Sequence, residues 1–164
     1  MRIKEWRDAI IEAAIIIILL FLFCWPVKIN GISMEHTFYD KNRVCISRIS
    51  KYINDIETGD IIVFSETLNG EKKELIKRVI AKEGDTVKID RGKVYVNSEE
   101  ITEDYTTGMT MGHIEITVPE NSFFVLGDNR EDSIDSRHLG TISKNDITGK
   151  VIFKIYPFDE IQLY

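Results

Sequence analysis

Cysteine and histidine are scarce in this chain, and negative charge outnumbers positive charge. The two cysteines, Cys24 and Cys45, are too few for a small disulfide-stabilised fold or for a zinc site built from four cysteines. The three histidines lack the spacing of a helical zinc motif, so the sequence predicts no metal site. The chain has 21 Lys+Arg against 27 Asp+Glu, a net charge of -6, which argues against a nucleic-acid partner.

The composition is otherwise that of an ordinary globular protein. Hydrophobic residues make up 43% of the 164 residues and charged residues 29%, so a packed core is expected rather than a disordered chain. The length suits one domain of ordinary size. The apolar residues are unevenly spread, however, and this divides the chain into two parts.

An uncharged apolar run begins at Ala13 and ends at Trp25. Taken as residues 9–27, the segment would measure about 28 Å as a helix, close to the roughly 30 Å of a bilayer core. Three basic residues lie in the first eight positions, whereas Lys28 is the only one between the segment and Lys41. This asymmetry predicts a cytoplasmic N-terminus.

Two other interpretations of the run fit less well. A buried core helix would have a polar face, which the run lacks. A cleaved secretory signal would need small residues at its cleavage site, and the sequence offers only residues 29–31 (ING). We therefore predict a cytoplasmic tail at 1–8, a single transmembrane anchor at 9–27 in the lipid bilayer of the cell membrane, and an extracytoplasmic domain at 28–164.

The rest of the chain has the pattern of a mainly β domain. Short segments rich in β-branched and aromatic residues are separated by turn signals, and no second helix or repeat is apparent. Strands are expected at 44–49, 60–64, 74–81, 86–90, 93–97, 113–118, 122–126 and 149–156. Cys45 falls in one of these strands and Cys24 in the apolar run, so both are predicted to be unpaired apolar fillers.

A serine and a lysine are the candidate catalytic groups. Ser33 follows the apolar run, and a serine needs a neighbouring base to become a nucleophile. Lys77 lies among apolar residues of a predicted strand, where burial disfavours an ammonium. To act as a base near neutrality its pKa must fall from about 10.4 to about 7, which corresponds to about 4 kcal/mol. Alone, each residue has an ordinary explanation, as a turn serine and as an edge lysine with its amine in water.

Four segments taken together indicate a family far more specifically than Ser33 or Lys77 does alone. They are 33–37 (SMEHT), 59–64 (GDIIVF), 77–85 (KRVIAKEGD) and 127–137 (GDNREDSIDSR). In order and spacing they resemble the type I signal peptidases, and the short anchor resembles the Gram-positive bacterial form. The resemblance covers nearly the whole chain. It implies antiparallel sheets of the signal-peptidase type behind one N-terminal transmembrane helix.

The resemblance implies a serine endopeptidase that uses a Ser/Lys dyad and neither metal nor cofactor. Ser33 would be acylated and Lys77 would be the general base. Ser133 matches the position that orients the lysine, and the backbone N–H of Ser33 would serve the oxyanion hole. The supporting charged positions are Asp128, Arg130, Asp135 and Arg137. A buried charge needs a partner, so Asp135 is expected to pair with Arg137 or Arg130.

The resemblance also implies the substrate, which is the signal peptide of an exported preprotein with an Ala-x-Ala site. The peptide would pair with a strand edge, and its small residues would enter shallow apolar pockets. Candidates for these pockets are Ile32, Met34 and Phe38, which are equally interpreted as core residues. No nucleic-acid partner is expected, and the sequence predicts no oligomeric state.

One position departs from the family pattern, and it opens an alternative. His36 stands where the family usually has proline, which frees φ and adds a backbone N–H. We expect a looser loop and an active enzyme. A Ser33–His36 dyad is the alternative, but it leaves Lys77 unexplained.

Two other classes of function compete with a signal peptidase. A self-cleaving Ser-Lys protease of the repressor kind is usually cytosolic and joined to a DNA-binding part, so the predicted anchor argues against it. An inactive, membrane-tethered β module that binds peptides would not need the segment 127–137.

Overall fold

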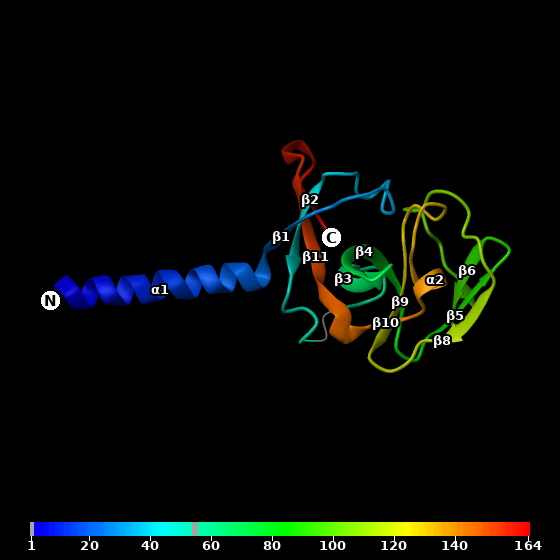
Figure 1. Cartoon of the computed structure of the whole chain (residues 1–164), viewed down its shortest axis with the longest axis horizontal. Coiled ribbons are helices and arrows are strands. Elements are labelled where there is room, and N and C mark those ends of the chain that lie inside the picture. The colour runs from blue at the N-terminus through cyan, green and yellow to red at the C-terminus, as the bar shows by residue number, and fades with distance from the viewer. Residues whose placement is uncertain (1, 54–55) are drawn as a thin grey trace.

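A long N-terminal helix leads into a β domain (Figure 1). The computed structural model describes residues 2–53 and 56–164. Helix α1, Arg2–Phe23, projects away from the domain, so the N-terminus lies far from every strand. Large apolar side chains along α1 are exposed, among them Ile10, Ile16 and Phe21. Within the described residues, no helix is both long and apolar enough to cross a membrane.

The helix ends before the predicted span does. Pro26 has no N–H to donate, and Trp25–Lys28 form strand β1, which pairs with β2 (Arg43–Ser47) so that Pro26 lies opposite Cys45. A disulfide joins Cys24 to Cys45. The prediction that both cysteines are unpaired is therefore wrong. It assumed that Cys24 lay within a membrane helix, whereas the end of α1 brings this residue beside β2.

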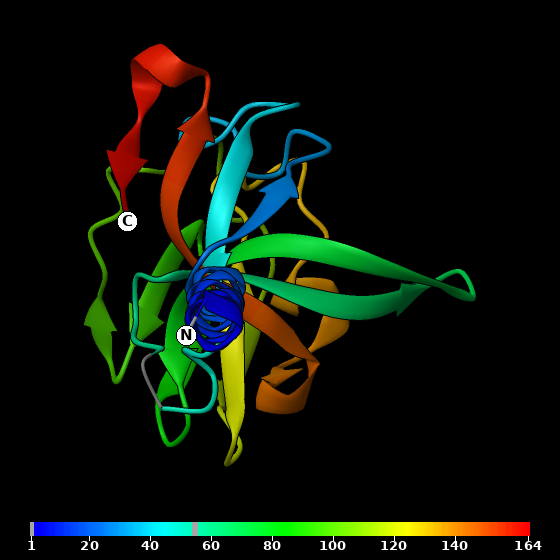
Figure 2. The ribbon, with the colours of Figure 1, turned by 90° about the vertical axis from the view of Figure 1, so that its left-hand side faces the viewer.

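Most strands belong to one large antiparallel sheet. In the described part of the chain it has eight strands in the order β1-β2-β11-β3-β4-β9-β10, with β12 paired to β11. Its further strands are β3 (Ile61–Leu68), β4 (Glu71–Lys82), β9 (Ser122–Leu126), β10 (Ile142–Ser143), β11 (Ile147–Tyr156) and β12 (Gln162–Leu163). Figure 2 looks along α1 and shows these strands arranged around and behind the helix.

A smaller antiparallel sheet is inserted between β4 and β9. Its order is β7-β6-β5-β8, with bounds Glu99–Glu100, Lys93–Val96, Thr86–Asp90 and Ile114–Thr117. The hairpin that the sequence predicts at 86–97 is present, with Asp90 opposite Lys93. This sheet lies at the end of the molecule opposite α1 (Figure 1). The prediction of a mainly β, antiparallel fold is confirmed.

Short helical turns complete the chain. Helix α2, Ser136–Leu139, is a single turn that the sequence did not predict, and its N-cap is Asp135. Two 3-10 turns, η1 (Lys144–Asp146) and η2 (Phe158–Glu160), flank β11. Helix α2 is too short to give a periodic apolar pattern, so its capping aspartate was the only local signal.

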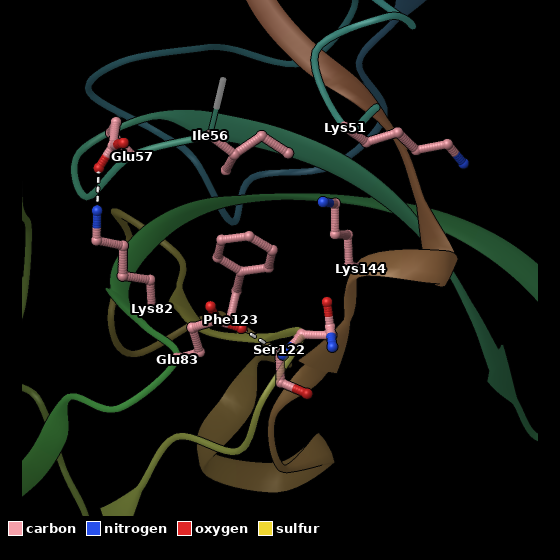
Figure 3. Close-up of a pocket in the computed structure, with 9 residues that line it drawn as sticks. Lys51, Ile56, Glu57, Lys82, Glu83, Ser122, Phe123 and Lys144 are labelled. Carbon is pink, nitrogen blue, oxygen red and sulfur yellow. Dashed lines mark hydrogen bonds and ion pairs between the residues drawn. The ribbon is translucent and has the colours of Figure 1, made fainter. Parts of the chain in front are cut away.

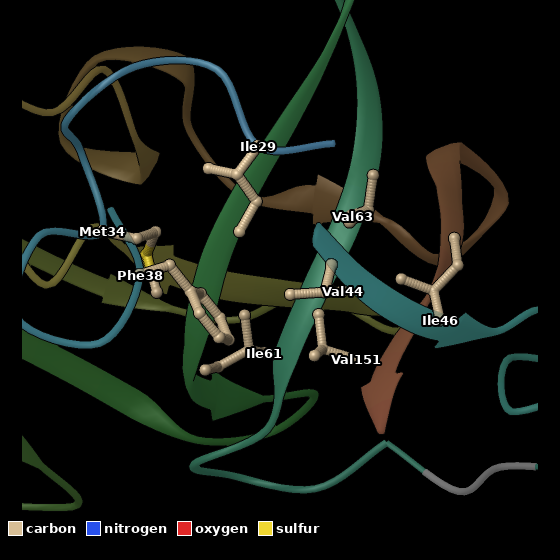
Figure 4. Close-up of a cluster of buried hydrophobic side chains, with 8 residues drawn as sticks. All are labelled: Ile29, Met34, Phe38, Val44, Ile46, Ile61, Val63 and Val151. Carbon is tan, nitrogen blue, oxygen red and sulfur yellow. The ribbon is translucent and has the colours of Figure 1, made fainter. Parts of the chain in front are cut away.

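Buried side chains fix the segment between β1 and β2. Figure 4 shows the cluster that they enter, formed by Ile29, Met34, Phe38, Val44, Ile46, Ile61, Val63 and Val151. Met34 and Phe38 are 1% and 0% exposed. A segment without regular structure is thereby held against the large sheet by its own apolar side chains.

Candidate active site

Ser33 lies in the segment between β1 and β2. Gly31, two residues before it, has a φ of +102°, a conformation that glycine adopts without a steric penalty. After Ser33, the N–H of Phe38 donates to the C=O of Met34 at 2.7 Å and closes a turn. Since both of these side chains are in the core, the backbone at Ser33 is firmly positioned.

Lys77 reaches Ser33 from the middle of β4. Its Nζ lies 2.7 Å from Oγ of Ser33, and it also donates to the C=O of Ile76 at 2.7 Å. Lys77 is 2% exposed, and Ile62 of β3 lies opposite it. The fold thus joins two groups that are 44 residues apart in the sequence. A neutral amine at this distance can accept the proton of the serine hydroxyl.

The surroundings of Lys77 favour its neutral form. Burial removes water from the ammonium and lowers the pKa of Lys77 from 10.5 to about 8. The carboxylates of Asp135 and Asp128 oppose this effect, since negative charge favours the ammonium. Burial dominates, so a usable fraction of the amine is unprotonated near neutral pH.

Gly127 marks the point where the segment 127–137 meets Ser33. A Cβ at this position would lie 2.2 Å from Oγ of Ser133 and 2.6 Å from the carbonyl oxygen of Ser33, so only glycine permits this contact. Oγ of Ser133 is buried and has no hydrogen-bond partner among the described residues. Ser133 therefore lies beside Gly127 and Ser33, and no bond joins it to Lys77 in this structure.

Arg78 connects three parts of the site. Its guanidinium bonds to both carboxylate oxygens of Asp128, at 2.9 and 2.7 Å, and to the hydroxyl of Thr37 at 3.2 Å. Thr37 in turn donates to Asp128 at 2.5 Å. The ring of Tyr105 covers the guanidinium, 4.0 Å from its carbon. The network ties the nucleophile segment to β4 and to Asp128, which is fully buried.

Asp135 holds the other side of Gly127. Its carboxylate accepts from the N–H of Gly127 at 3.0 Å and from Arg137 through two bonds of 2.9 Å. Burial by itself would raise the pKa of Asp135, but the bonds from Arg137 and from Gly127 outweigh it and lower that pKa. Arg137 is thus the partner among the two that the sequence suggested.

Arg130 also lies behind Gly127. Its Nε donates to the carbonyl of Gly127 at 3.0 Å, and its guanidinium pairs with Glu103 and bonds to Thr110 at 2.6 Å. The arginine is 1% exposed. It therefore joins the irregular segment before β8 to the site.

His36 is exposed on the turn that follows Ser33. Its φ is +89°, a value that the proline of the family pattern cannot adopt. It lines a cavity of about 780 Å³ together with Arg78 and Tyr105. The structure describes both His36 and Ser33 and shows no hydrogen bond between them, which removes the support for a Ser33–His36 dyad.

A groove is lined in part by Ile76, whose carbonyl accepts a hydrogen bond from Lys77. It has a volume of about 500 Å³ and is lined by residues 27–30 on one bank and by Val63 and 73–76 on the other. β1 is the outermost strand of the large sheet. Residues 71–77 of β4 pair with β3 on one side, whereas β9 begins to pair on the other side only at Arg78. Two open strand edges therefore border the groove.

The three pocket residues suggested by the sequence are not brought together at this groove. Met34 and Phe38 belong to the core cluster, while Ile32 is 44% exposed. The groove residues were missed because they flank a turn and a strand edge, and only the folded sheet sets them opposite each other. Thr37 and Arg78 stand within the matched segments, but Tyr105 carries no sequence signal.

A third cavity lies apart from these groups (Figure 3). Its volume is about 330 Å³, and Phe123 and Ile56 form its apolar part. Three lysines border it, of which Lys82 is paired with Glu57. Its lining includes neither Ser33, nor Lys77, nor a chain neighbour of either, whereas Ile76, the residue before Lys77, lines the groove, so we take the groove as the candidate site. Among the described residues, no cluster of His, Cys, Asp or Glu is arranged to hold a metal ion.

Comparison with known proteins adds independent information. Residues 3–156 match the family model described as signal peptidase, peptidase S26. The chain is 36% identical to signal peptidase I of Bacillus amyloliquefaciens, with 98% of this chain and 91% of that protein covered. It is 35% identical to signal peptidase I S of Bacillus subtilis (strain 168), over 98% and 92%. A signal peptidase I structure from Enterococcus faecalis V583 matches with a TM-score of 0.50 and 30% identity, over 57% of this chain and 94% of that one.

Proposed function

Because the chain belongs to the signal peptidase I family, peptidase S26, we propose that it cleaves signal peptides with Ser33 as nucleophile and Lys77 as general base. That it is a serine peptidase follows from the family. The observation that carries the catalytic assignment is the 2.7 Å distance between Nζ of Lys77 and Oγ of Ser33, in surroundings that leave the lysine 2% exposed. Such a lysine has little other reason to be buried.

The two groups suffice for the proton transfers of acyl transfer. Neutral Lys77 takes the hydroxyl proton as Oγ of Ser33 attacks the scissile carbonyl, and the Ser33 N–H stabilises the oxyanion. When the C–N bond breaks, the ammonium returns the proton to the departing amine, which leaves the signal peptide esterified to Ser33. Lys77 then takes a proton from water as it attacks the ester, and returns it to the departing serine oxygen.

The groove suits an extended peptide with small side chains. A peptide placed between β1 and β4 can bond through its backbone to an open edge. Alternate side chains of an extended chain point to the same face, so the residues one and three before the cut enter the groove together. The groove has apolar lining from Val27, Ile29 and Ile76, and we assign it to the alanines of an Ala-x-Ala site.

We assign α1 to the cell membrane, with residues 1–8 cytoplasmic, the helical residues 9–23 in the lipid bilayer, and the chain from Cys24 onward, which is bonded to the β domain, on the outer side. Support comes from the apolar side chains of α1 that the β domain leaves exposed, such as Ile10 and Phe21. The basic residues at the start of the chain favour the cytoplasmic side. Ser33, shortly after the helix, would then meet signal peptides where they emerge from the bilayer.

The competing functions explain less of this geometry. A self-cleaving protease would present a segment of its own chain to Ser33, whereas the groove is an open volume. A tethered module that only binds peptides would not need Lys77 buried against a serine hydroxyl. Neither accounts for the shared position of these two groups.

Cleavage of a preprotein tests the proposal directly. The full-length protein in detergent is expected to cut a preprotein with an Ala-x-Ala site, and sequencing of the product should find the residue after the second alanine at its N-terminus. Phenylalanine in place of that alanine should reduce the rate about 100-fold, since a larger side chain at this position would displace the scissile bond from Ser33.

The matched control is the removal of a different serine hydroxyl. Ser65→Ala on β3 should cleave as the unmodified protein does, whereas Ser33→Ala should give no product. Product formation by Ser33→Ala at the unmodified rate would disprove the assignment of the nucleophile.

The rate should depend on pH through Lys77. Because its pKa is about 8 and the neutral amine is the base, kcat/KM should fall about tenfold per pH unit below that value and level off above it. A profile from pH 6 to pH 10 measures this limb, with circular dichroism to verify that the protein stays folded. A flat profile between pH 6 and pH 8 would contradict Lys77 as the base.

A further inference from the structure

The groove along β4 ends where β9 begins. Leu126 of β9 lies opposite Arg78, and Phe123 lies opposite Lys82. Residues of β4 before Arg78 have β3 on one side and, among the described residues, no paired strand on the other. A peptide that adds to this part of β4 is therefore in line with β9 and meets its end. At Gly127, the residue of this chain that follows Leu126, the peptide therefore has to leave the sheet.

We propose that the mature part of the preprotein leaves the sheet at Gly127 and passes over an exit surface formed by Ile32, Met111 and Ile134. This inference rests on the proposed function, which puts the signal peptide in the groove and the scissile bond at Ser33. The three side chains are 44%, 64% and 52% exposed. Hydrogen bonds join the segments that carry them, from Asn129 to Ile32 and from Arg137 to Met111, and exposed apolar side chains beside a reactive group are typical of a contact surface.

The exit surface adjoins the nucleophile. Asn129 donates its N–H to the C=O of Ser33 at 3.1 Å and its side-chain amide to the C=O of Ile32 at 3.3 Å. Ser133, the residue before Ile134, lies against Gly127 together with the carbonyl of Ser33. A chain that passes Ser33 therefore comes to Ile134 within its first few residues.

The exit surface is also held rigidly. Ile134 stands between Ser133 and Asp135, which are both buried. Asp135 is bonded to Gly127 and to Arg137, and Arg137 donates to the C=O of Met111 at 3.5 Å. Helix α2 follows directly and lies against β9. Such support lets Ile134 contact a passing peptide without first being ordered by it.

The position of the two ends of the substrate can be tested with introduced cysteines. Cys24 and Cys45 are bonded to each other, so an added cysteine supplies the reactive thiol. In the Ser33→Ala background, Ile134→Cys should crosslink to a preprotein with a cysteine two residues after the cut. Lys28→Cys, in the groove, should crosslink to a preprotein with a cysteine five residues before it.

The outcomes separate this inference from the proposed function. If Lys28→Cys forms its crosslink and Ile134→Cys does not, or Ile134→Cys captures the cysteine before the cut, the exit surface is wrong and the groove stands. If neither variant crosslinks to either preprotein, the proposed function fails, and the exit surface with it.

Kinetics give a second measurement. Ile134→Ala should lower kcat/KM about three- to tenfold for a preprotein, because it removes exposed apolar contact area. It should leave unchanged the cleavage of a peptide ester that has no residues after the cut. Ile53→Ala, which alters an equally exposed isoleucine elsewhere, should change neither rate. Equal losses on both substrates for Ile134→Ala would overturn the exit surface.

Discussion

Lys77→Met is expected to lower kcat by about 10,000-fold while the protein stays folded. Methionine has a similar length and lacks the amine, so it removes the base and fills the space. Burial of Lys77 lowers the stability of the folded protein, since the lowered pKa of about 8 means that the fold disfavours the ammonium. That cost is full below pH 8 and is relieved as the pH rises towards the unfolded-state pKa. The melting temperature at pH 7 should therefore stay the same or rise.

Two variants separate the role of the base from other effects of the substitution. Lys77→Arg keeps a positive charge that cannot be lost near neutral pH, so it should be as inactive as Lys77→Met. Lys154→Met changes another buried lysine, paired with Glu160 at 2.6 Å, and should retain activity at temperatures where it is folded. An active Lys77→Arg enzyme would show that positive charge, and not proton transfer, is what the site requires.

Gly127→Ala should reduce kcat about 100-fold even where the variant is fully folded, because displacing a nucleophile by about 1 Å has such an effect. The added methyl group would lie 2.6 Å from the carbonyl oxygen of Ser33 and 2.2 Å from Oγ of Ser133. The N–H of Gly127 is bonded to Asp135 and its carbonyl to Arg130, so the glycine itself cannot move aside. The displacement falls on the segment that carries Ser33.

A substitution at a second glycine, Gly149, is the control for the effect of overpacking without displacement of Ser33. A Cβ on Gly149 of β11 would lie 2.7 Å from the carbonyl oxygen of Ser47, remote from the site. Gly149→Ala should lower the free energy of unfolding by about 1–3 kcal/mol and the melting temperature with it. It should keep the kcat of the unmodified protein per folded molecule. The comparison uses kcat measured well below both melting temperatures. A Gly127→Ala enzyme with unchanged kcat would show that Ser33 tolerates the shift.

The strands of this domain were predictable because their apolar patterns are local. Strand β8 (Ile114–Thr117) alternates in the sequence and alternates between half-buried and exposed in the fold. Strand β1 was not predictable, because Trp25 and Val27 continue the apolar run of α1. Only the pairing with β2 shows that the chain changes from helix to strand there.

The candidate site was predictable only in part. Ser33 or Lys77 alone is weak evidence for a catalytic site. Only the four matched segments link the two residues as a candidate pair. Met34 and Phe38 could not be assigned from the sequence, since apolar residues beside a nucleophile suit a pocket and a core equally. Their near-complete burial decides this in the fold. The bond from Cys24 to Cys45 depends on where α1 ends, and that boundary is poorly defined by the sequence.

Pro26 has a consequence for how copies of this protein meet one another. It lies in β1, the outermost strand of the large sheet, and an outermost strand is where two β proteins can join edge to edge and aggregate. A proline lacks the N–H that such a ladder needs at its position. Val27 and Lys28 of the same strand line the groove, so the proposed recognition of a short peptide there is compatible with this proline. Pairing of two molecules through this edge is therefore disfavoured, even where copies of the protein are concentrated.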